Sequence, residues 1–272
     1  MAAGVGKTYR MLLEGRQAAD EGQDVVIGYL EPHDRPETTA LADGLELVPR
    51  LRAQHGALEL EEMDLDAVLA RAPALALIDE LAHTNAPGLR HEKRWQDIED
   101  VLAAGIDVIS TVNVQHLESL NDAIFELTDV RVRETFPDHV LDEADEVVLV
   151  DLSPEELQER LRAGKVYPKE RAAVAIENFF RSDKLAVLRE LALREVAEDV
   201  EAKRDVAVQW CGWATEHAQS YGGKPWRYAL IPHDASKIPN RLPSMPSVRL
   251  STSSCRAIRP RPAPSAIRMV NS

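Results

Sequence analysis

The chain has 272 residues, of which 44% are hydrophobic and 29% are charged, and its formal net charge is −14. This composition is typical of a folded globular protein rather than a disordered chain. The sequence has no run of about 18 apolar residues and no leader-like apolar segment, so we expect neither a transmembrane helix nor secretion. The cysteines, Cys211 and Cys255, lack the spacing of metal ligands, which favours a reduced, cytoplasmic protein.

The charge is distributed unevenly along the chain. Residues 221–272 contain nine basic residues and one acidic residue, whereas the other 220 residues contain 23 basic and 45 acidic residues. An acidic body disfavours nonspecific contact with nucleic acid, which we therefore do not expect as a partner. The basic segment is either an arm that contacts nucleic acid or anionic lipid, or an unselected tail, and we favour the tail.

Apolar periodicity and turn residues predict alternating helices and strands. In chain order we expect a helix at 7–21, a strand at 24–30, a short helix at 36–43, short strands within 45–60, a helix capped by Asp64 that ends at Arg71, a strand at 75–79, a helix at 91–104, a strand at 106–112, a helix at 116–127, an edge strand at 130–134, a strand at 146–150, and helices at 154–163, 168–178 and 183–208.

This alternation indicates an α/β fold with a parallel sheet and helices on both faces, as in P-loop NTPases, followed by a helical part. We expect one domain at residues 1–208 and a basic tail without regular structure at 209–272. A P-loop follows a strand, but here the loop begins at residue 2. We therefore expect the first strand of the sheet to be missing, through a truncation or a misassigned start.

The candidate phosphate loop is Ala-Gly-Val-Gly-Lys-Thr at residues 3–8. Met1 stands where the first glycine of the G-x-x-x-x-G-K-[ST] pattern belongs, and the rest of the pattern is present. Gly4, Val5 and Gly6 would turn backbone N–H groups toward phosphate oxygens. Lys7 would contact the β- and γ-phosphates of ATP, and Thr8 would ligate Mg²⁺. The alternative is a chance Gly-Lys-Thr at a helix start.

A second candidate element is the apolar strand that ends in Asp79 and Glu80. Asp79 would hold the Mg²⁺ ion, and Glu80 would orient an attacking water. Thr84 and Asn85 follow, and they either contact the γ-phosphate or its water or serve as turn residues, because Asn-Ala-Pro-Gly is a loop signal. The predicted cofactors are ATP and Mg²⁺.

Polar residues also follow the strand at 106–112, namely Thr111, Asn113, Gln115 and His116. They belong to the same sheet edge as Asp79, since ligands of open α/β sheets bind at the carboxyl ends of the strands. We interpret His116 as an ordinary residue at a helix start. We expect the basic group Arg90, Lys93 and Arg94 to form a solvated helix face rather than a phosphate contact.

Several long segments resemble the N-terminal domain of the Kdp-type osmosensitive potassium-channel sensor histidine kinase, KdpD. They are Ala-Gly-Val-Gly-Lys-Thr-Tyr-Arg-Met-Leu, Val-Val-Ile-Gly-Tyr-Leu-Glu-Pro-His-Asp-Arg-Pro-Glu-Thr, Leu-Ile-Asp-Glu-Leu-Ala-His-Thr-Asn-Ala-Pro-Gly and Ser-Thr-Val-Asn-Val-Gln-His-Leu-Glu-Ser-Leu-Asn-Asp. The resemblance covers about residues 2–200. It implies a cytoplasmic ATP-binding regulatory domain of a two-component potassium sensor, with the sensor kinase or its response regulator as partner.

The resemblance to the full-length kinase is incomplete. We find no transmembrane helices and no kinase core with a phosphoacceptor histidine, so enzyme activity stays open, with weak ATP hydrolysis as one outcome. The alternatives are a free-standing P-loop ATPase or kinase, and a non-functional fused gene fragment. Residues 205–235 weakly resemble the C-terminal end of the helicase subunit of type III restriction enzymes.

Overall fold

The computed structural model describes residues 4–31, 36–55, 58–128, 131–164, 166, 172, 176, 180–219 and 267–271. The described residues form two units by their contacts. One unit comprises residues 4–195 together with 267–271, and the other comprises residues 196–219. The domain boundary that we expected between residues 208 and 209 stays a prediction.

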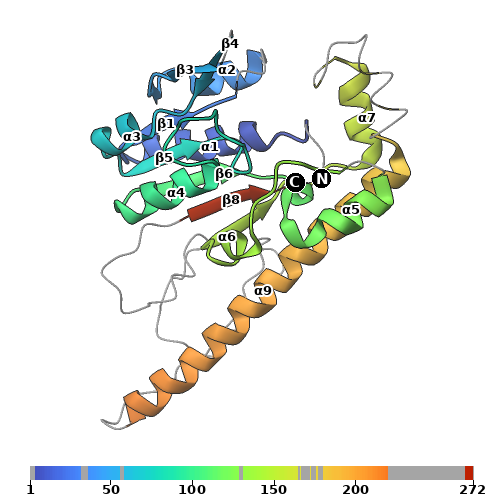
Figure 1. Cartoon of the computed structure of the whole chain (residues 1–272). Coiled ribbons are helices and arrows are strands. Elements are labelled where there is room, and N and C mark those ends of the chain that lie inside the picture. The colour runs from blue at the N-terminus through green and yellow to red at the C-terminus, as the bar shows by residue number, and fades with distance from the viewer. Residues whose placement is uncertain are drawn as a thin grey trace. The chain divides into compact units, whose positions relative to one another are not determined.

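The larger unit contains a six-stranded sheet in which every neighbouring pair of strands is parallel. The strand order is β2-β1-β5-β6-β8-β7, with bounds β1 Val25–Tyr29, β2 Glu46–Leu47, β5 Leu75–Ile78, β6 Asp107–Thr111, β7 Glu146–Leu149 and β8 Ile267–Asn271 (Figure 1). A separate antiparallel hairpin consists of β3 Leu51–His55 and β4 Leu58–Glu62. The parallel sheet of the α/β class is thus confirmed.

The helices are α1 Lys7–Asp20, α2 Pro36–Ala42, α3 Leu65–Arg71, α4 Arg94–Ala103, α5 Asn121–Thr128, α6 Asp138–Asp142, α7 Pro154–Arg162 and α9 Ser182–Gln219, with 3₁₀ turns at Val114–His116 and Glu118–Leu120. As predicted, the Asp64 side chain caps α3 by accepting from the Ala67 N–H at 2.9 Å. None of the helices within the described ranges combines the length and the hydrophobicity needed to cross a bilayer.

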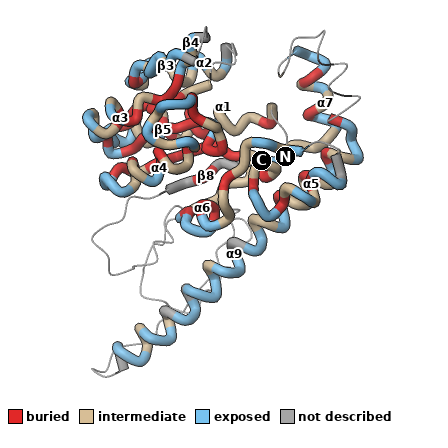
Figure 2. The backbone as a smooth tube through the Cα atoms, viewed as in Figure 1, coloured by how far each residue is buried: buried red, intermediate tan, exposed pale blue. Residues whose placement is uncertain are grey.

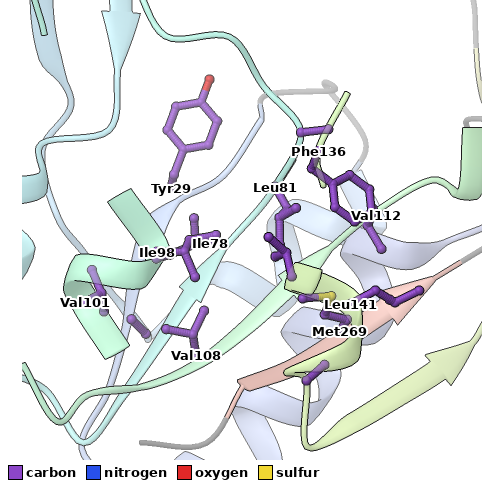
Figure 3. Packing of buried hydrophobic residues seen from close by; sticks show 14 of the residues in the cluster. Tyr29, Ile78, Leu81, Ile98, Val101, Val108, Val112, Phe136, Leu141 and Met269 are labelled. Atoms are coloured by element: carbon purple, nitrogen blue, oxygen red, sulfur yellow. The ribbon is translucent and has the colours of Figure 1, made fainter. Parts of the chain in front are cut away.

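Helices cover both faces of the sheet, because alternate strand residues enter different cores. On one face, Met11 and Leu12 of α1 pack on Val25, Ile27 and Leu77. On the other face, the α4 residues Ile98 and Val101 join Ile78 and Val108 (Figure 3). The buried residues accordingly run along the strands and the inner sides of the helices (Figure 2).

Two predicted elements differ from the structure. The edge strand expected at 130–134 is wrong for residues 131–134, which are not in a strand. The long helix continues to Gln219 instead of ending at 208. The helix expected at 168–178 lies almost wholly outside the described residues. In addition, β8 is formed by part of the segment in which we expected no regular structure.

Candidate functional site

The loop before α1 depends on its two glycines. Gly4 has φ 96° and Gly6 has φ 107°, in the left-handed region that other residues rarely adopt. A Cβ atom on Gly4 would also lie 2.4 Å from Cγ2 of Val166. The loop therefore adopts a backbone conformation that glycine accommodates and that other residues rarely adopt.

Helix α7 holds this loop in place. Arg160 Nη1 donates to the carbonyl oxygens of Gly4 at 3.1 Å and Val5 at 3.2 Å. The Val5 side chain is buried in a cluster that includes Leu157 and Leu161 of α7. Sequence analysis missed Arg160, because no local pattern links it to a loop more than 150 positions earlier. Beside the loop lies an open hollow whose walls include Gly4, Gly6 and Arg160, α1 residues Tyr9, Arg10 and Leu13, and part of α2.

Lys7, at the first position of α1, reaches the residues that follow β6. Its Nζ donates to Asn113 Oδ1 at 2.6 Å. The Asn113 amide lies 3.5 Å from His116 Nε2, and His116 Nδ1 lies 2.7 Å from the carbonyl oxygen of Glu134. A neutral imidazole with its proton on Nδ1 satisfies both contacts. Desolvation lowers the pKa of His116, and the nearby Lys7 charge acts in the same direction. We interpreted His116 as an ordinary residue at a helix start, but the structure shows that it contacts Asn113, the partner of Lys7.

Thr8 and Asp79, the two residues that the motifs assigned to Mg²⁺, are in contact at the sheet edge. The Thr8 hydroxyl lies 3.1 Å from Asp79 Oδ2. Thr111, at the end of β6, also donates its hydroxyl to Asp79. The Glu80 N–H bonds to Asp79 Oδ1 at 3.2 Å and to the Thr111 hydroxyl at 3.1 Å. The ends of α1, β5 and β6 thus converge on one carboxylate.

The Asp79 carboxylate is buried, with 1% of the residue exposed. Its described donors are two hydroxyl groups and one backbone N–H, all of them uncharged. The nearby cation, Arg94, bonds to the main-chain oxygen of Asp79 and pairs with Glu62 instead. Because a buried charge is costly unless a counter-charge is close, the site favours an added cation at this carboxylate.

Glu80 follows Asp79 in an uncommon conformation for a non-glycine residue, with φ 57°. Desolvation and the neighbouring Asp79 and Glu31 carboxylates raise the Glu80 pKa to about 7. The side chain is exposed, so water reduces the size of this shift but not its direction. Glu80 is therefore an accessible carboxyl group that can exchange a proton near neutral pH.

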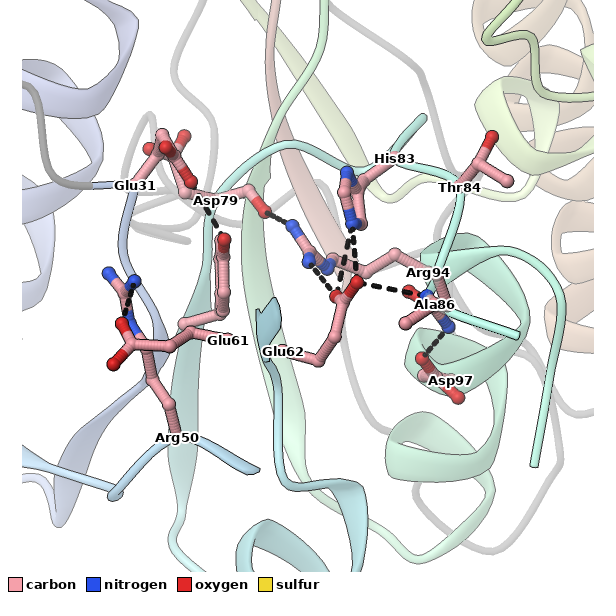
Figure 4. A network of polar contacts seen from close by, with 12 residues as sticks. Glu31, Arg50, Glu61, Glu62, Asp79, His83, Thr84, Ala86, Arg94 and Asp97 are labelled. Atoms are coloured by element: carbon pink, nitrogen blue, oxygen red, sulfur yellow. Dashed lines mark hydrogen bonds and ion pairs between the residues drawn. The ribbon is translucent and has the colours of Figure 1, made fainter. Parts of the chain in front are cut away.

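Behind the site lies a buried polar network around Arg94 (Figure 4). Arg94 is fully buried, pairs with Glu62 at 3.2 Å, donates to the Asp79 main-chain oxygen at 3.2 Å and stacks 3.7 Å from the Tyr29 ring centroid. Burial raises the pKa of Glu62, but the His83 hydrogen bond and the charges of His83 and Arg94 outweigh it and leave the pKa lowered. The expectation that Arg94 lies on a solvated helix face was wrong. Arg90 is exposed, as expected.

The structure places Thr84 and Asn85 beside α4. The Thr84 hydroxyl accepts from Lys93 Nζ at 2.7 Å. The buried Asn85 amide donates to Asp97 of α4 at 2.6 Å and to the His91 carbonyl oxygen at 3.2 Å. These bonds fix the turn that leads into α4, and they do not join Thr84 or Asn85 to Lys7, Thr8 or Asp79.

The residues present fit a nucleotide phosphate with magnesium better than a metal held by protein alone. Within the described ranges, no three His, Cys, Asp or Glu residues gather as a metal cluster. Mg²⁺ usually takes one or two carboxylates together with phosphate oxygens and water, and a single buried carboxylate beside a threonine hydroxyl suits that pattern.

Comparison with known proteins agrees with the resemblance seen in the sequence. Residues 1–200 match the family model KdpD, described as the osmosensitive K⁺ channel His kinase sensor domain. A KdpD sensor protein from Synechocystis sp. is 60% identical over 201 residues, which cover 74% of this chain and 54% of that protein. The Escherichia coli sensor protein KdpD is 56% identical over 199 residues, which cover 73% of this chain and 22% of that protein.

A third relative, the sensor protein KdpD of Clostridium acetobutylicum, is 50% identical over 206 residues, which cover 76% of this chain and 23% of that protein. The chain therefore spans from about a quarter to about half of the length of these relatives. The likeness of residues 205–235 to a restriction-enzyme subunit stays a prediction. With most of its length matched, the chain belongs to the KdpD sensor-domain family of potassium-responsive histidine kinases.

Proposed function

We propose that the loop at residues 4–8 binds ATP with Mg²⁺, and that this binding regulates a potassium-responsive sensor histidine kinase. The observation that carries the proposal is the meeting of Thr8 with Asp79 at 3.1 Å. A threonine after the loop lysine and a carboxylate at a strand end are the two protein groups that flank Mg²⁺ in a P-loop.

The surrounding residues support the same assignment. Gly4 and Gly6 allow the backbone before α1 to curve, and the N-terminus of α1 adds the N–H groups of its first turn and the positive end of its dipole. Lys7, which donates to the Asn113 amide oxygen, adds a positive charge beside the loop that would attract a phosphate oxygen.

The Asp79 carboxylate is the reason that the proposed ligand includes magnesium. It is buried among uncharged donors, so a divalent cation would supply the missing counter-charge. A bound Mg²⁺·ATP would supply this cation together with the phosphate oxygens that complete its coordination.

The regulatory part of the proposal comes from the family. The family description names a sensor domain of a histidine kinase, and the matched relatives are sensor proteins. We assign this chain to the cytoplasm, with the kinase or its response regulator as partner. Hydrolysis of ATP through Glu80 would be slow unless an arginine stabilised the charge of the transition state.

A magnesium titration tests the assignment. We expect Mg²⁺ to raise ATP affinity by about tenfold or more in the wild type and to have no such effect in Asp79→Asn, since the ion's carboxylate is lost. Without ligand, Asp79→Asn should unfold at the same temperature as the wild type or higher, because it removes a buried, uncompensated charge.

Arg52→Ala, in the exposed hairpin, provides the control that should leave both quantities unchanged. A purely structural Asp79 would give the opposite pattern, namely a lower unfolding temperature of Asp79→Asn and an unaltered magnesium dependence.

A further inference from the structure

The strand β8 comes from the far end of the chain and lies inside the sheet. It pairs in parallel with β6, from Val108 opposite Ile267 to Thr111 opposite Val270, and on its other side with β7. Figure 1 shows β8, in red, among elements of the first 150 residues. In the described strand order, β7 is joined to the sheet through β8. Removing β8 would therefore leave two unpaired strand edges in place of two ladders.

The core also contains a side chain from this strand. Met269 is completely buried and belongs to the hydrophobic cluster that includes Val108, Val112 and Leu141 (Figure 3). Because this side chain fills volume that would otherwise be left as a cavity, it stabilises the strand in its place. The segment is thus held by backbone pairing on both sides and by one core residue.

The position of β8 in the sheet relates it to the phosphate loop. A phosphate loop is preceded by a strand and followed by a helix that packs back on the sheet. Helix α1, which begins directly after the loop, packs against β6 and β8. Because the strands of the six-stranded sheet are all parallel, the end of β8 at Asn271 lies at the sheet edge that also carries Asp79 and Thr111. A strand beneath α1 that ends at this edge stands where the strand before a phosphate loop belongs.

We propose that residues 267–271 act as the strand of the phosphate loop, supplied from the C-terminal end of the chain. The slot between β6 and β7 is a binding site for a parallel strand, and this segment is its occupant. ATP binding then depends on insertion of the C-terminal strand, so displacement of this strand switches the site off. The claim that ATP binding depends on this strand rests on the proposed function, whereas the claim that the strand occupies the slot does not.

Hydrogen exchange of the complete chain tests the slot without reference to ATP. We expect the backbone amides of residues 268–271 and of β7 to be protected together, and Met269→Asp to abolish protection in both, because a buried charge expels the strand. Met269→Leu should retain protection. Unprotected backbone amides at residues 268–271 in the wild type, or protected amides of β7 in Met269→Asp, would contradict the proposed strand slot.

Calorimetry on the same variants tests whether ATP binding depends on insertion of β8. We expect Met269→Asp to weaken ATP binding by about tenfold or more. Val68→Ala, which removes buried volume from α3, should lower stability and leave ATP affinity unchanged. Equal losses of affinity in Met269→Asp and Val68→Ala would attribute the effect to general destabilisation and would overturn the dependence.

A rescue variant covers the case in which Met269→Asp fails to fold. It carries Met269→Asp together with a copy of residues 262–272 fused directly ahead of Met1, so that a strand leads into the loop. We expect protection of β7 and ATP affinity to return, and no recovery would contradict the assigned place of β8. If the wild type binds no ATP, the proposed function fails, and the exchange data alone decide whether the slot exists.

Discussion

Lys7 Nζ lies 2.6 Å from Asn113 Oδ1, although the two residues are 106 positions apart in the sequence. This contact joins the first turn of α1 to the residues that follow β6. Lys7 is thereby held at the carboxyl edge of the sheet with the Asn113 amide as a hydrogen-bond partner. A phosphate oxygen can accept a charge-assisted hydrogen bond from the Lys7 ammonium in place of this amide.

A negative charge at Asn113 should weaken ATP binding. In Asn113→Asp the new carboxylate pairs with Lys7 and repels the phosphates, so we expect about tenfold weaker binding by calorimetry. Asn113→Ala removes the amide without adding charge and should have a smaller effect. Equal affinities of Asn113→Asp and the wild type would show that Lys7 does not contact the bound nucleotide.

The two substitutions Gly6→Ala and Gly22→Ala distinguish backbone strain that affects ATP binding from backbone strain that affects only stability. Both glycines have a positive φ, 107° and 91°, so each change should lower the free energy of unfolding by about 1–2 kcal/mol. Only Gly6→Ala should also reduce ATP affinity, because Gly6 shapes the loop and Gly22 follows the far end of α1. Urea unfolding and calorimetry measure the two effects, and reduced affinity in Gly22→Ala would contradict this separation.

Any ATP hydrolysis should depend on pH through Glu80. With its pKa raised to about 7, Glu80 can accept a proton from water above that pH but not below it, so the rate should rise between pH 6 and pH 8. Glu80→Gln should remove this rise and lower the rate at pH 8 by about 10²-fold. Steady-state phosphate release measures it, and an unchanged pH profile in Glu80→Gln would exclude Glu80 as the base.

The same raised pKa affects stability in a defined direction. The folded state binds the Glu80 proton more tightly than the unfolded state, whose pKa is near 4.5. The Glu80 contribution is therefore fully favourable below pH 4.5 and is lost as the pH rises through 7. The difference in unfolding temperature between Glu80→Gln and the wild type should accordingly grow over this range, and solvent at the exposed side chain will limit its size.

Loss of Arg94 should be far more damaging than loss of its neighbour Arg90. Arg94→Ala leaves the buried Glu62 carboxylate without its arginine partner, which should cost about 3–5 kcal/mol in urea unfolding. Among the described residues, the ion pairs of Arg90, with Asp66 and Asp100, are exposed, so Arg90→Ala should cost about 1 kcal/mol or less. Similar costs for the two variants would contradict the buried network.

The sequence predicted the parts of this protein that depend on local pattern. Apolar runs identified β1, β5, β6 and β7. The strands β1, β5 and most of β6 are buried, as expected for a parallel sheet covered on both faces, whereas the edge strand β7 is half-buried. The rule that parallel strands share one carboxyl edge placed Asp79 and Thr111 together, and the loop motif added Thr8. In the structure the hydroxyl groups of Thr8 and Thr111 both contact the Asp79 carboxylate.

The remaining features depend on contacts between distant segments. Arg94 looks like a surface residue beside Arg90 and Lys93, and only the packing of α4 against Glu62 and Tyr29 buries it. Arg160 contacts the loop through tertiary structure alone. The strand at 267–271 is short, and it follows a long segment rich in Ser, Pro and Arg, so its pairing with β6 and β7 has no local signal.

The most direct test of the central claim is the calorimetric titration of ATP·Mg²⁺ into this chain and into Lys7→Ala, side by side. The account predicts micromolar binding by the wild type, as in a typical nucleotide site, and affinity reduced by about tenfold or more in Lys7→Ala. Equal affinities of the two proteins, or no binding by the wild type, would contradict the assignment of residues 4–8 as a phosphate-binding loop.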